Sequence, residues 1–116
     1  MRLRPALLLT IASVAACSRA PPPIGRGLPV DFGYTPYFND RVSKRYPPGS
    51  DETKLIAELR REGFAVTENH DRPSRYRLSG TYEINSLVCK DVWAIEWTSE
   101  QGKIKKIWAE SRDLCL

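Results

Sequence analysis

The stretch Val92-Trp93-Ala94-Ile95-Glu96-Trp97 decides the fold that this chain is predicted to adopt. Its large apolar side chains, Trp93, Ile95 and Trp97, recur at every second position, which places them on one face of a β-strand. Residues 99–103, Ser-Glu-Gln-Gly-Lys, follow closely and contain a glycine placed for a positive φ. We therefore expect a tight turn there and a strand that returns antiparallel to the first.

The returning strand, Ile104 to Glu110, lacks a clean alternation. Ile104, Ile107 and Trp108 are its large apolar residues, and their spacing does not fit a single face of a regular strand. A β-bulge, which inserts one extra residue into one strand of a pair, accounts for this spacing. We expect such a bulge near Lys105-Lys106.

Two cysteines, Cys89 and Cys115, flank this predicted hairpin. If the turn centres on residue 101 or 102, the numbers of paired residues sum to about 202–204, which places Cys89 opposite residues 113–115. In an oxidising export compartment such a pair forms a disulfide. The alternative is two free or metal-binding cysteines. Because the chain has one histidine and no CxxC motif, we predict neither a metal site nor a cofactor.

Further strands are expected before the hairpin. Phe64–Thr67 is short and rich in β-forming residues, and the polar stretch Glu68–Ser74 follows it as a loop. Arg75–Leu78 alternates polar and apolar residues and predicts a second strand. This strand continues past Gly80 towards Ile84, and the glycine is expected to mark a bulge or a bend.

The first of two predicted helices runs from Pro36 to about Arg45. Thr35 can cap it, and a proline at the first helical position is favourable. Phe38, Val42 and Tyr46 recur at intervals of four residues and predict a core-facing stripe. The alternative for these aromatic residues is an exposed recognition patch.

The second predicted helix runs from about Asp51 to Glu62. Ser50 can cap its start, and Leu55, Ile56 and Leu59 form its apolar stripe. Gly63 stands where a left-handed residue ends a helix, and Phe64 follows it in the position that contacts Leu59 in a Schellman motif. Two short helices followed by a small antiparallel sheet predict an α+β domain, with the helices on one face of the sheet.

The start of the chain, residues 1–18, has a different character. Arg2 and Arg4 precede an apolar run, Ala6 to Ala16, which is too short to cross the roughly 30 Å hydrocarbon core of a membrane. A basic start, a short apolar run and a small-residue exit are typical of a secretory signal peptide. The run ends in Val14-Ala15-Ala16-Cys17, which resembles the lipobox of bacterial prolipoproteins.

This resemblance implies a lipid anchor and a location in the cell envelope. In that family a diacylglycerol is attached to the cysteine sulfur, a peptidase cuts before the cysteine, and the new amine is acylated. Cys17 would then hold the chain to a membrane through its lipid. By the same resemblance, Ser18 rather than aspartate after the cysteine favours the periplasmic face of the outer membrane in a Gram-negative host. The alternative is an ordinary cleaved signal with a nearby cysteine.

The predicted organisation has three parts: a signal peptide at 1–16, a lipidated proline- and glycine-rich tether at 17–30, and an α+β domain at 31–116. The formal charge of +4 falls to about +2 once Arg2 and Arg4 are removed, so charge gives no reason to expect a nucleic-acid partner. The order of tether, helices and strands is loosely similar to that of BamE (SmpA/OmlA) outer-membrane lipoproteins. No motif of that family can be placed residue by residue, so its assembly role is not carried over.

The sequence offers little for catalysis. His70 lies in a polar loop beside Asp71, with Ser74 nearby, but nothing resembles a nucleophile elbow or an oxyanion site. We therefore predict a protein that is not an enzyme and takes no small-molecule substrate.

The candidate binding face comprises an aromatic and basic set on the hairpin: Trp97, Lys105, Lys106 and Trp108. Two of the three tryptophans are expected in the core, and the third is left open between the core and a binding face. The function predicted first is a non-catalytic envelope lipoprotein that binds an unidentified envelope protein or supports structure. The alternatives are a periplasmic inhibitor or immunity-type protein acting through Glu68–Ser74, and, ranked lowest, a small hydrolase.

Overall fold

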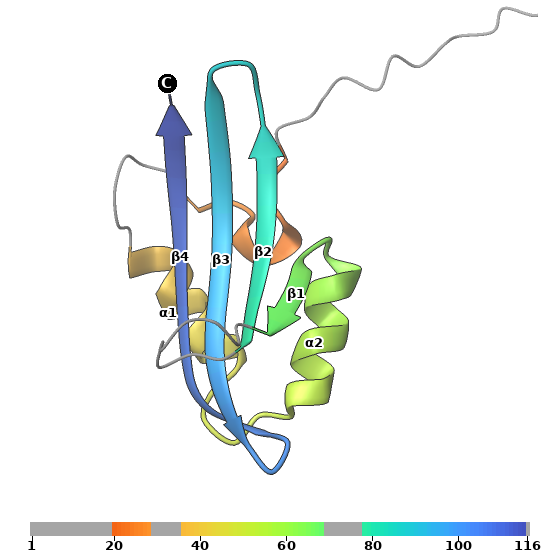
Figure 1. Cartoon of the computed structure of the whole chain (residues 1–116). Helices are drawn as coiled ribbons and strands as arrows, with labels where there is room; N and C mark the ends of the chain where they lie inside the picture. Colours follow the sequence, from red (N-terminus) through yellow and green to blue (C-terminus); the bar gives the residue numbers. More distant parts are fainter. Residues whose placement is uncertain (1–19, 29–35, 69–77, 116) are drawn as a thin grey trace, which may run out of the picture.

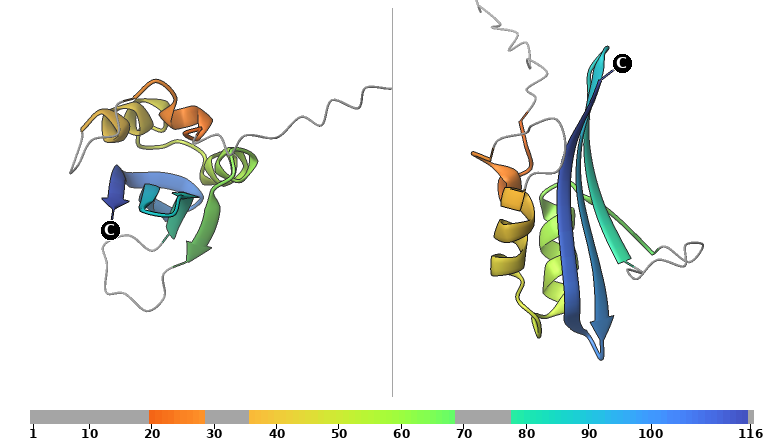
Figure 2. Two further views of the ribbon diagram at one scale, coloured as in Figure 1. Left: turned by 90° about the horizontal axis from the view of Figure 1, so that it is seen from above. Right: turned by 90° about the vertical axis from the view of Figure 1, so that its left-hand side faces the viewer.

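The computed structural model describes residues 20–28, 36–68 and 78–115 of the chain, and the ordered elements form two layers. Cys17, Thr35, His70, Asp71 and Ser74 lie outside the described residues. The helices are η1 (Pro23–Gly25), α1 (Pro36–Arg45) and α2 (Glu52–Arg61), and the strands are β1 (Ala65–Glu68), β2 (Leu78–Asn85), β3 (Cys89–Glu100) and β4 (Lys103–Cys115). The strands form one antiparallel sheet in the order β1-β2-β3-β4. All three helices lie on one face of it (Figures 1 and 2), which confirms the α+β class.

Helix α1 has the predicted bounds, and its predicted stripe is in the core. Phe38, Val42 and Tyr46, which follows the helix, are at most 4% exposed. The neighbouring Tyr37 is 56% exposed, so one tyrosine of this segment lies at the surface. Packing against the sheet, rather than recognition, therefore explains the repeated apolar positions.

Helix α2 begins one residue later than predicted, because its cap is Asp51 and not Ser50. The Asp51 carboxylate accepts a hydrogen bond from the Thr53 amide at 2.9 Å. Ser50 is engaged elsewhere, since its carbonyl accepts from the Ile104 amide of β4 at 2.9 Å. The predicted Schellman ending is confirmed: the amides of Gly63 and Phe64 donate to the Arg60 and Leu59 carbonyls, and Gly63 has φ +97°.

Strand β2 is continuous through Gly80, so the bulge or bend predicted there is wrong. Gly80 pairs with Val66 of β1 on one side and Ile95 of β3 on the other, without a break in register. A Cβ at this position would lie 3.1 Å from Leu59 Cδ1. The glycine therefore allows α2 to approach the sheet closely. Strand β1 also extends through Glu68, which was predicted to begin the loop.

The predicted hairpin is confirmed in β3 and β4, but its strands are longer and its turn is shorter than predicted. Gln101 and Gly102 form its turn, both with positive φ. The register then shifts by one residue, because Ser99 pairs with Ile104 whereas Thr98 pairs with Lys106. Lys105 is thus the extra residue of the predicted bulge. The bulge puts Ile104 and Ile107 on the same face and brings Cys89 opposite Cys115.

The core lies between the helices and the inner face of the sheet. Trp93, Ile95 and Trp97 point into it and are at most 1% exposed. Phe38 meets Trp93 edge to face, with ring centroids 5.0 Å apart. The core also includes Ile24, Val42, Tyr46, Leu55, Leu59, Phe64, Ile104 and Ala109.

The described part of the predicted tether, residues 20–28, is packed onto the domain, which corrects the boundary at residue 30. Ile24 is 2% exposed, and its amide donates to a Glu62 carboxylate oxygen at 2.7 Å. The Arg41 guanidinium donates to the carbonyl of Arg26 at 2.6 Å. A Cβ on Gly25 would lie 2.6 Å from the Trp93 ring, so only a glycine fits there without displacing the ring. These contacts hold the segment against the domain, although a run of prolines by itself favours an extended spacer.

Strand β4 forms one edge of the sheet, and α1 lies against it. The Ala109 amide points outward from the ladder and donates to the side-chain carbonyl of Asn39 in α1 at 3.0 Å. A helix side chain thus satisfies a backbone donor that an edge strand would otherwise present to solvent or to another strand.

Candidate functional site

The predicted binding face is divided between the two faces of the sheet. Trp97 is fully buried under the helices, where its indole N–H donates to Glu52 Oε2 at 3.1 Å. Trp108 pairs with Glu96 and therefore lies on the opposite, outer face, half-buried. Lys105 and Lys106 are exposed at the bulge, and Lys105 forms an ion pair with Glu100 at 3.4 Å. The four residues therefore do not form one surface. The prediction that two of the three tryptophans lie in the core is confirmed by Trp93 and Trp97.

A different feature stands out at the far end of the sheet. Strands β2, β3 and β4 extend beyond the helices, and the β2–β3 turn and the end of β4 lie together there (Figures 1 and 2). The Cys89–Cys115 disulfide, with an S–S distance of 2.11 Å, joins β3 to β4 at this end. The disulfide predicted from the hairpin spacing is therefore present.

Apolar side chains are exposed at this end. Leu87 is 98% exposed and Val88 58%, and they are the two central residues of the turn. Leu114, on β4 opposite Lys90, is 53% exposed. We call Leu87, Val88 and Leu114 the apolar tip. Glycine, asparagine and aspartate are the usual residues of such turns, so two aliphatic side chains at the apex are unusual.

The turn of the apolar tip is held by Ser86. The Ser86 amide donates to the Cys89 carbonyl at 2.7 Å, and the Cys89 amide donates to the Ser86 hydroxyl oxygen at 2.9 Å. The disulfide fixes Cys89 in turn. Leu87 and Val88 are thus presented outward by a braced backbone, which lowers the entropy lost when they meet a partner.

Cys89, Cys115 and Asp113 bring potential metal-ligand atoms within 4.8 Å of one another. In the oxidised chain the two sulfurs are bonded to each other and are not thiolates, which are the form that binds metals. The group therefore acts as a covalent staple in this structure.

The described titratable groups with the clearest shifts join α1 to α2. The Tyr46 hydroxyl donates to Glu58 Oε2, and Arg45 lies 3.3 Å from the same oxygen. Burial and the hydrogen bond to Glu58 raise the pKa of Tyr46, while the hydrogen bond from Tyr46 and the Arg45 charge lower the pKa of Glu58. Arg45 also approaches Glu62 at 3.5 Å, so the network reaches the residue that holds Ile24.

The Tyr46→Phe variant is expected to lose about 1.5–3 kcal/mol of unfolding free energy at neutral pH, because its hydrogen bond goes to a charged acceptor. Since the folded pKa of Glu58 is lowered, its stabilising contribution is present above its unfolded pKa and is lost as the pH falls through the folded pKa. The difference between variant and parent should therefore shrink in acid. Urea unfolding across the acid range measures both effects.

Tyr37→Phe is the matched control, because the exposed Tyr37 lies on the same helix. It is expected to change the unfolding free energy by no more than about 0.5 kcal/mol. Equal losses for the two variants would contradict the assigned role of the Tyr46 hydroxyl.

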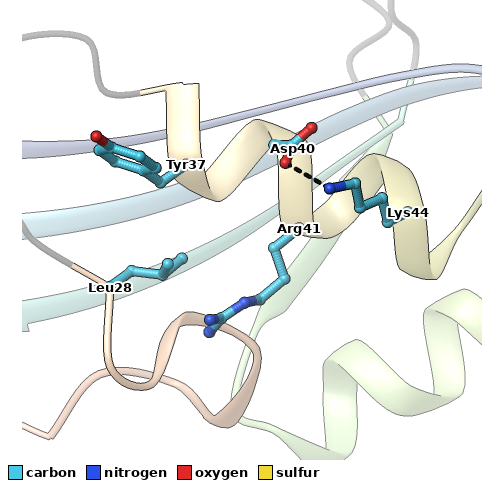
Figure 3. A pocket seen from close by; sticks show the side chains of 5 residues that line it. All are labelled: Leu28, Tyr37, Asp40, Arg41 and Lys44. Carbon is cyan, nitrogen blue, oxygen red and sulfur yellow. Dashed lines mark ion pairs between the residues drawn. The ribbon is translucent and has the colours of Figure 1, made fainter.

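A shallow cleft of about 260 Å³ lies between α1 and the N-terminal segment, lined by Leu28, Tyr37, Asp40, Arg41 and Lys44. Figure 3 shows Asp40 and Lys44 paired along the helix, 3.0 Å apart. Arg41 points to the N-terminal segment and donates to its carbonyls. The charged groups of the cleft thus already hold these two segments together, which favours a structural role.

The sequence prediction missed the apolar tip. The signal that identifies it is the Leu87-Val88 pair between a strand and a cysteine, where a polar turn is expected.

Within the described residues, no helix has the length and the apolar character that crossing a membrane requires. Comparisons of this chain with protein-family models, with curated proteins and with solved structures give no match.

Proposed function

We propose that this chain is a lipid-anchored envelope lipoprotein, held at the periplasmic face of the outer membrane, whose small domain binds a protein or supports structure. The observation that carries the proposal is the segment Val14-Ala15-Ala16-Cys17 behind a basic, apolar start. Two or three acyl chains on Cys17 would hold the chain durably, whereas one chain alone holds a protein only marginally.

The described domain is compatible with this proposal in two ways. Its cysteines are bridged, and disulfides persist in oxidising export compartments. Its described titratable network, Tyr46 with Glu58 and Arg45, joins two helices rather than lining a cavity where a substrate would bind. Both features stabilise the domain and are compatible with a binding or structural module.

The Cys17→Ser variant tests the anchor. The parent chain, expressed in a Gram-negative host, should fractionate with membranes and carry the added mass of a diacylglycerol and an acyl chain on Cys17. The variant should lose that mass and accumulate as an unprocessed precursor, because the lipid must be attached before the signal is cut in this pathway. Intact-mass spectrometry and membrane fractionation give the two readouts.

Ser18→Ala is the matched control, since it changes the neighbouring residue and leaves the cysteine in place. It should retain lipid mass and membrane fractionation. If Cys17→Ser is processed and fractionated like the parent, the lipid anchor is wrong and the chain has an ordinary cleaved signal.

A further inference from the structure

We propose that the apolar tip contacts the same lipid leaflet that holds the anchor, so that the domain has a defined orientation on the membrane. The inference rests on the proposed lipidation of Cys17. It adds a second, non-covalent membrane contact formed by Leu87, Val88 and Leu114 of the folded domain.

The first step is the length of chain between anchor and domain. The described structure begins at Ala20, whose carbonyl accepts a hydrogen bond from the Tyr82 hydroxyl of β2 at 3.4 Å. Phe64 and Gly63 pack against the Tyr82 ring, which fixes where that hydroxyl lies. Cys17 is three positions before Ala20, so the Cα atoms of the two residues are at most about 11 Å apart. The reach of the lipid anchor is therefore set by Ala20, whose carbonyl lies beside Tyr82 in the middle of β2.

The second step is the direction of the apolar tip. From Tyr82, strand β2 runs on to Asn85, and the turn with Leu87 and Val88 follows. At about 3.3 Å a residue, Leu87 lies at most roughly 16 Å past Tyr82. Figures 1 and 2 show that this end of the sheet extends past η1 and the described N-terminal segment around it. Tyr82 pairs with Trp93, which is nearer along β3 to the Leu87-Val88 turn than to Gln101, so the start of the described chain and the apolar tip belong to the same half of the molecule.

The third step is the chemistry of this end. Lys90 is paired with Glu83 at 3.2 Å and Arg112 with Glu110 at 3.1 Å, so the charges flanking the tip are largely matched. The exposed large apolar side chains at this end are Leu87, Val88 and Leu114, and the polar side chains of Asn85 and Asp113 lie beside them in the sequence. The aliphatic side chains favour the hydrocarbon boundary of a bilayer, and without an excess of cations the contact does not depend on anionic lipids.

The resulting arrangement divides two tasks. The acyl chains supply the affinity for the membrane, and the braced turn sets the orientation of the domain. The strands of the sheet then have a fixed orientation relative to the bilayer. The Gln101-Gly102 turn, at the end of the sheet opposite the apolar tip, points away from the bilayer.

Photo-crosslinking tests the contact. A benzophenone-bearing phenylalanine analogue is placed at position 87 of the full chain, and the lipidated protein is reconstituted into vesicles of phosphatidylethanolamine and phosphatidylglycerol. Lys54 provides the control position, because it is exposed in the first turn of α2. Glu52, two residues before it, donates its amide to the Gly102 carbonyl at the opposite end of the molecule. After illumination, adducts with lipid are measured by mass spectrometry.

Position 87 should yield severalfold more lipid adduct than position 54, with little change between low and high salt. Equal yields at the two positions, or no lipid adduct at position 87, overturn the proposal. If crosslinking in native membranes yields protein adducts at position 87 in place of lipid, the apolar tip is a protein-binding element and the proposal is also overturned.

Intact mass separates this proposal from the one on which it rests. A purified chain without lipid mass on Cys17 means that the proposed function has failed, and the tip contact fails with it. A lipidated chain that gives no lipid adduct at position 87 overturns only the tip contact.

Discussion

Replacing Trp93 with alanine is expected to lower the free energy of unfolding by about 3–5 kcal/mol. Truncating a large aromatic side chain in a core leaves a cavity that the surrounding residues only partly fill. Trp93 is 1% exposed and lies between Phe38 and the backbone of Gly25. It therefore joins the sheet, α1 and the N-terminal segment. Small domains have a total stability of about 5–15 kcal/mol, so this variant approaches unfolding. Urea denaturation followed by circular dichroism measures the loss.

Trp108→Ala is the matched control, since Trp108 is half-buried on the outer face of the same hairpin. Its loss should be clearly smaller. Trp93→Phe, which keeps an aromatic ring, should fall between the parent and Trp93→Ala and remains measurable if the alanine variant does not fold. A loss at Trp108 that equals or exceeds the loss at Trp93 would contradict the assigned core.

Removing the disulfide with Cys89→Ser and Cys115→Ser together is expected to cost about 3.5 kcal/mol, from the entropy of closing a loop of this size in the unfolded chain. The two cysteines are 26 positions apart. The variant should unfold at a lower urea concentration with an otherwise native circular dichroism spectrum, because the hairpin retains its turn and its backbone ladder.

The parent protein treated with reductant is the comparison for this variant, and both should lose similar stability. Lys90→Ala controls for local surface changes, because Lys90 is half-buried and follows Cys89 in the sequence. This variant removes the ion pair with Glu83 and should lose less than about 1 kcal/mol of unfolding free energy. A double cysteine variant as stable as the oxidised parent would show that the bridge does not stabilise the fold.

The elements that the sequence predicted best are those with local causes. The bounds of α1, the Schellman ending at Gly63 and the turn at Gly102 depend on residues within a few positions of one another. Predicting that Cys89 lies opposite Cys115 also depends on the bulge. With Lys105 as an extra residue the pair sum rises from 203 at Glu100–Lys103 to 204 at Cys89–Cys115, within the predicted range.

The predictions that failed depend on contacts between distant parts of the chain. Pro21-Pro22-Pro23 predicts an extended spacer, but Ile24 is buried because Glu62 holds its amide. The split of Trp97 and Trp108 follows from the bulged register, in which Trp97 pairs with Ile107 and so leaves Trp108 on the opposite face. The residues near Gly80 in the sequence do not predict that Leu59 of α2 packs over this glycine.

The hydrogen bond from the Ala109 amide to Asn39 has a consequence for copies of this chain at high concentration. An uncovered sheet edge of this length is a template on which a neighbouring copy adds its own strand, and repetition of that step builds a fibre. The Asn39 amide group occupies a donor in the middle of β4 and interrupts that template. That donor is therefore not available to the strand of a neighbouring copy.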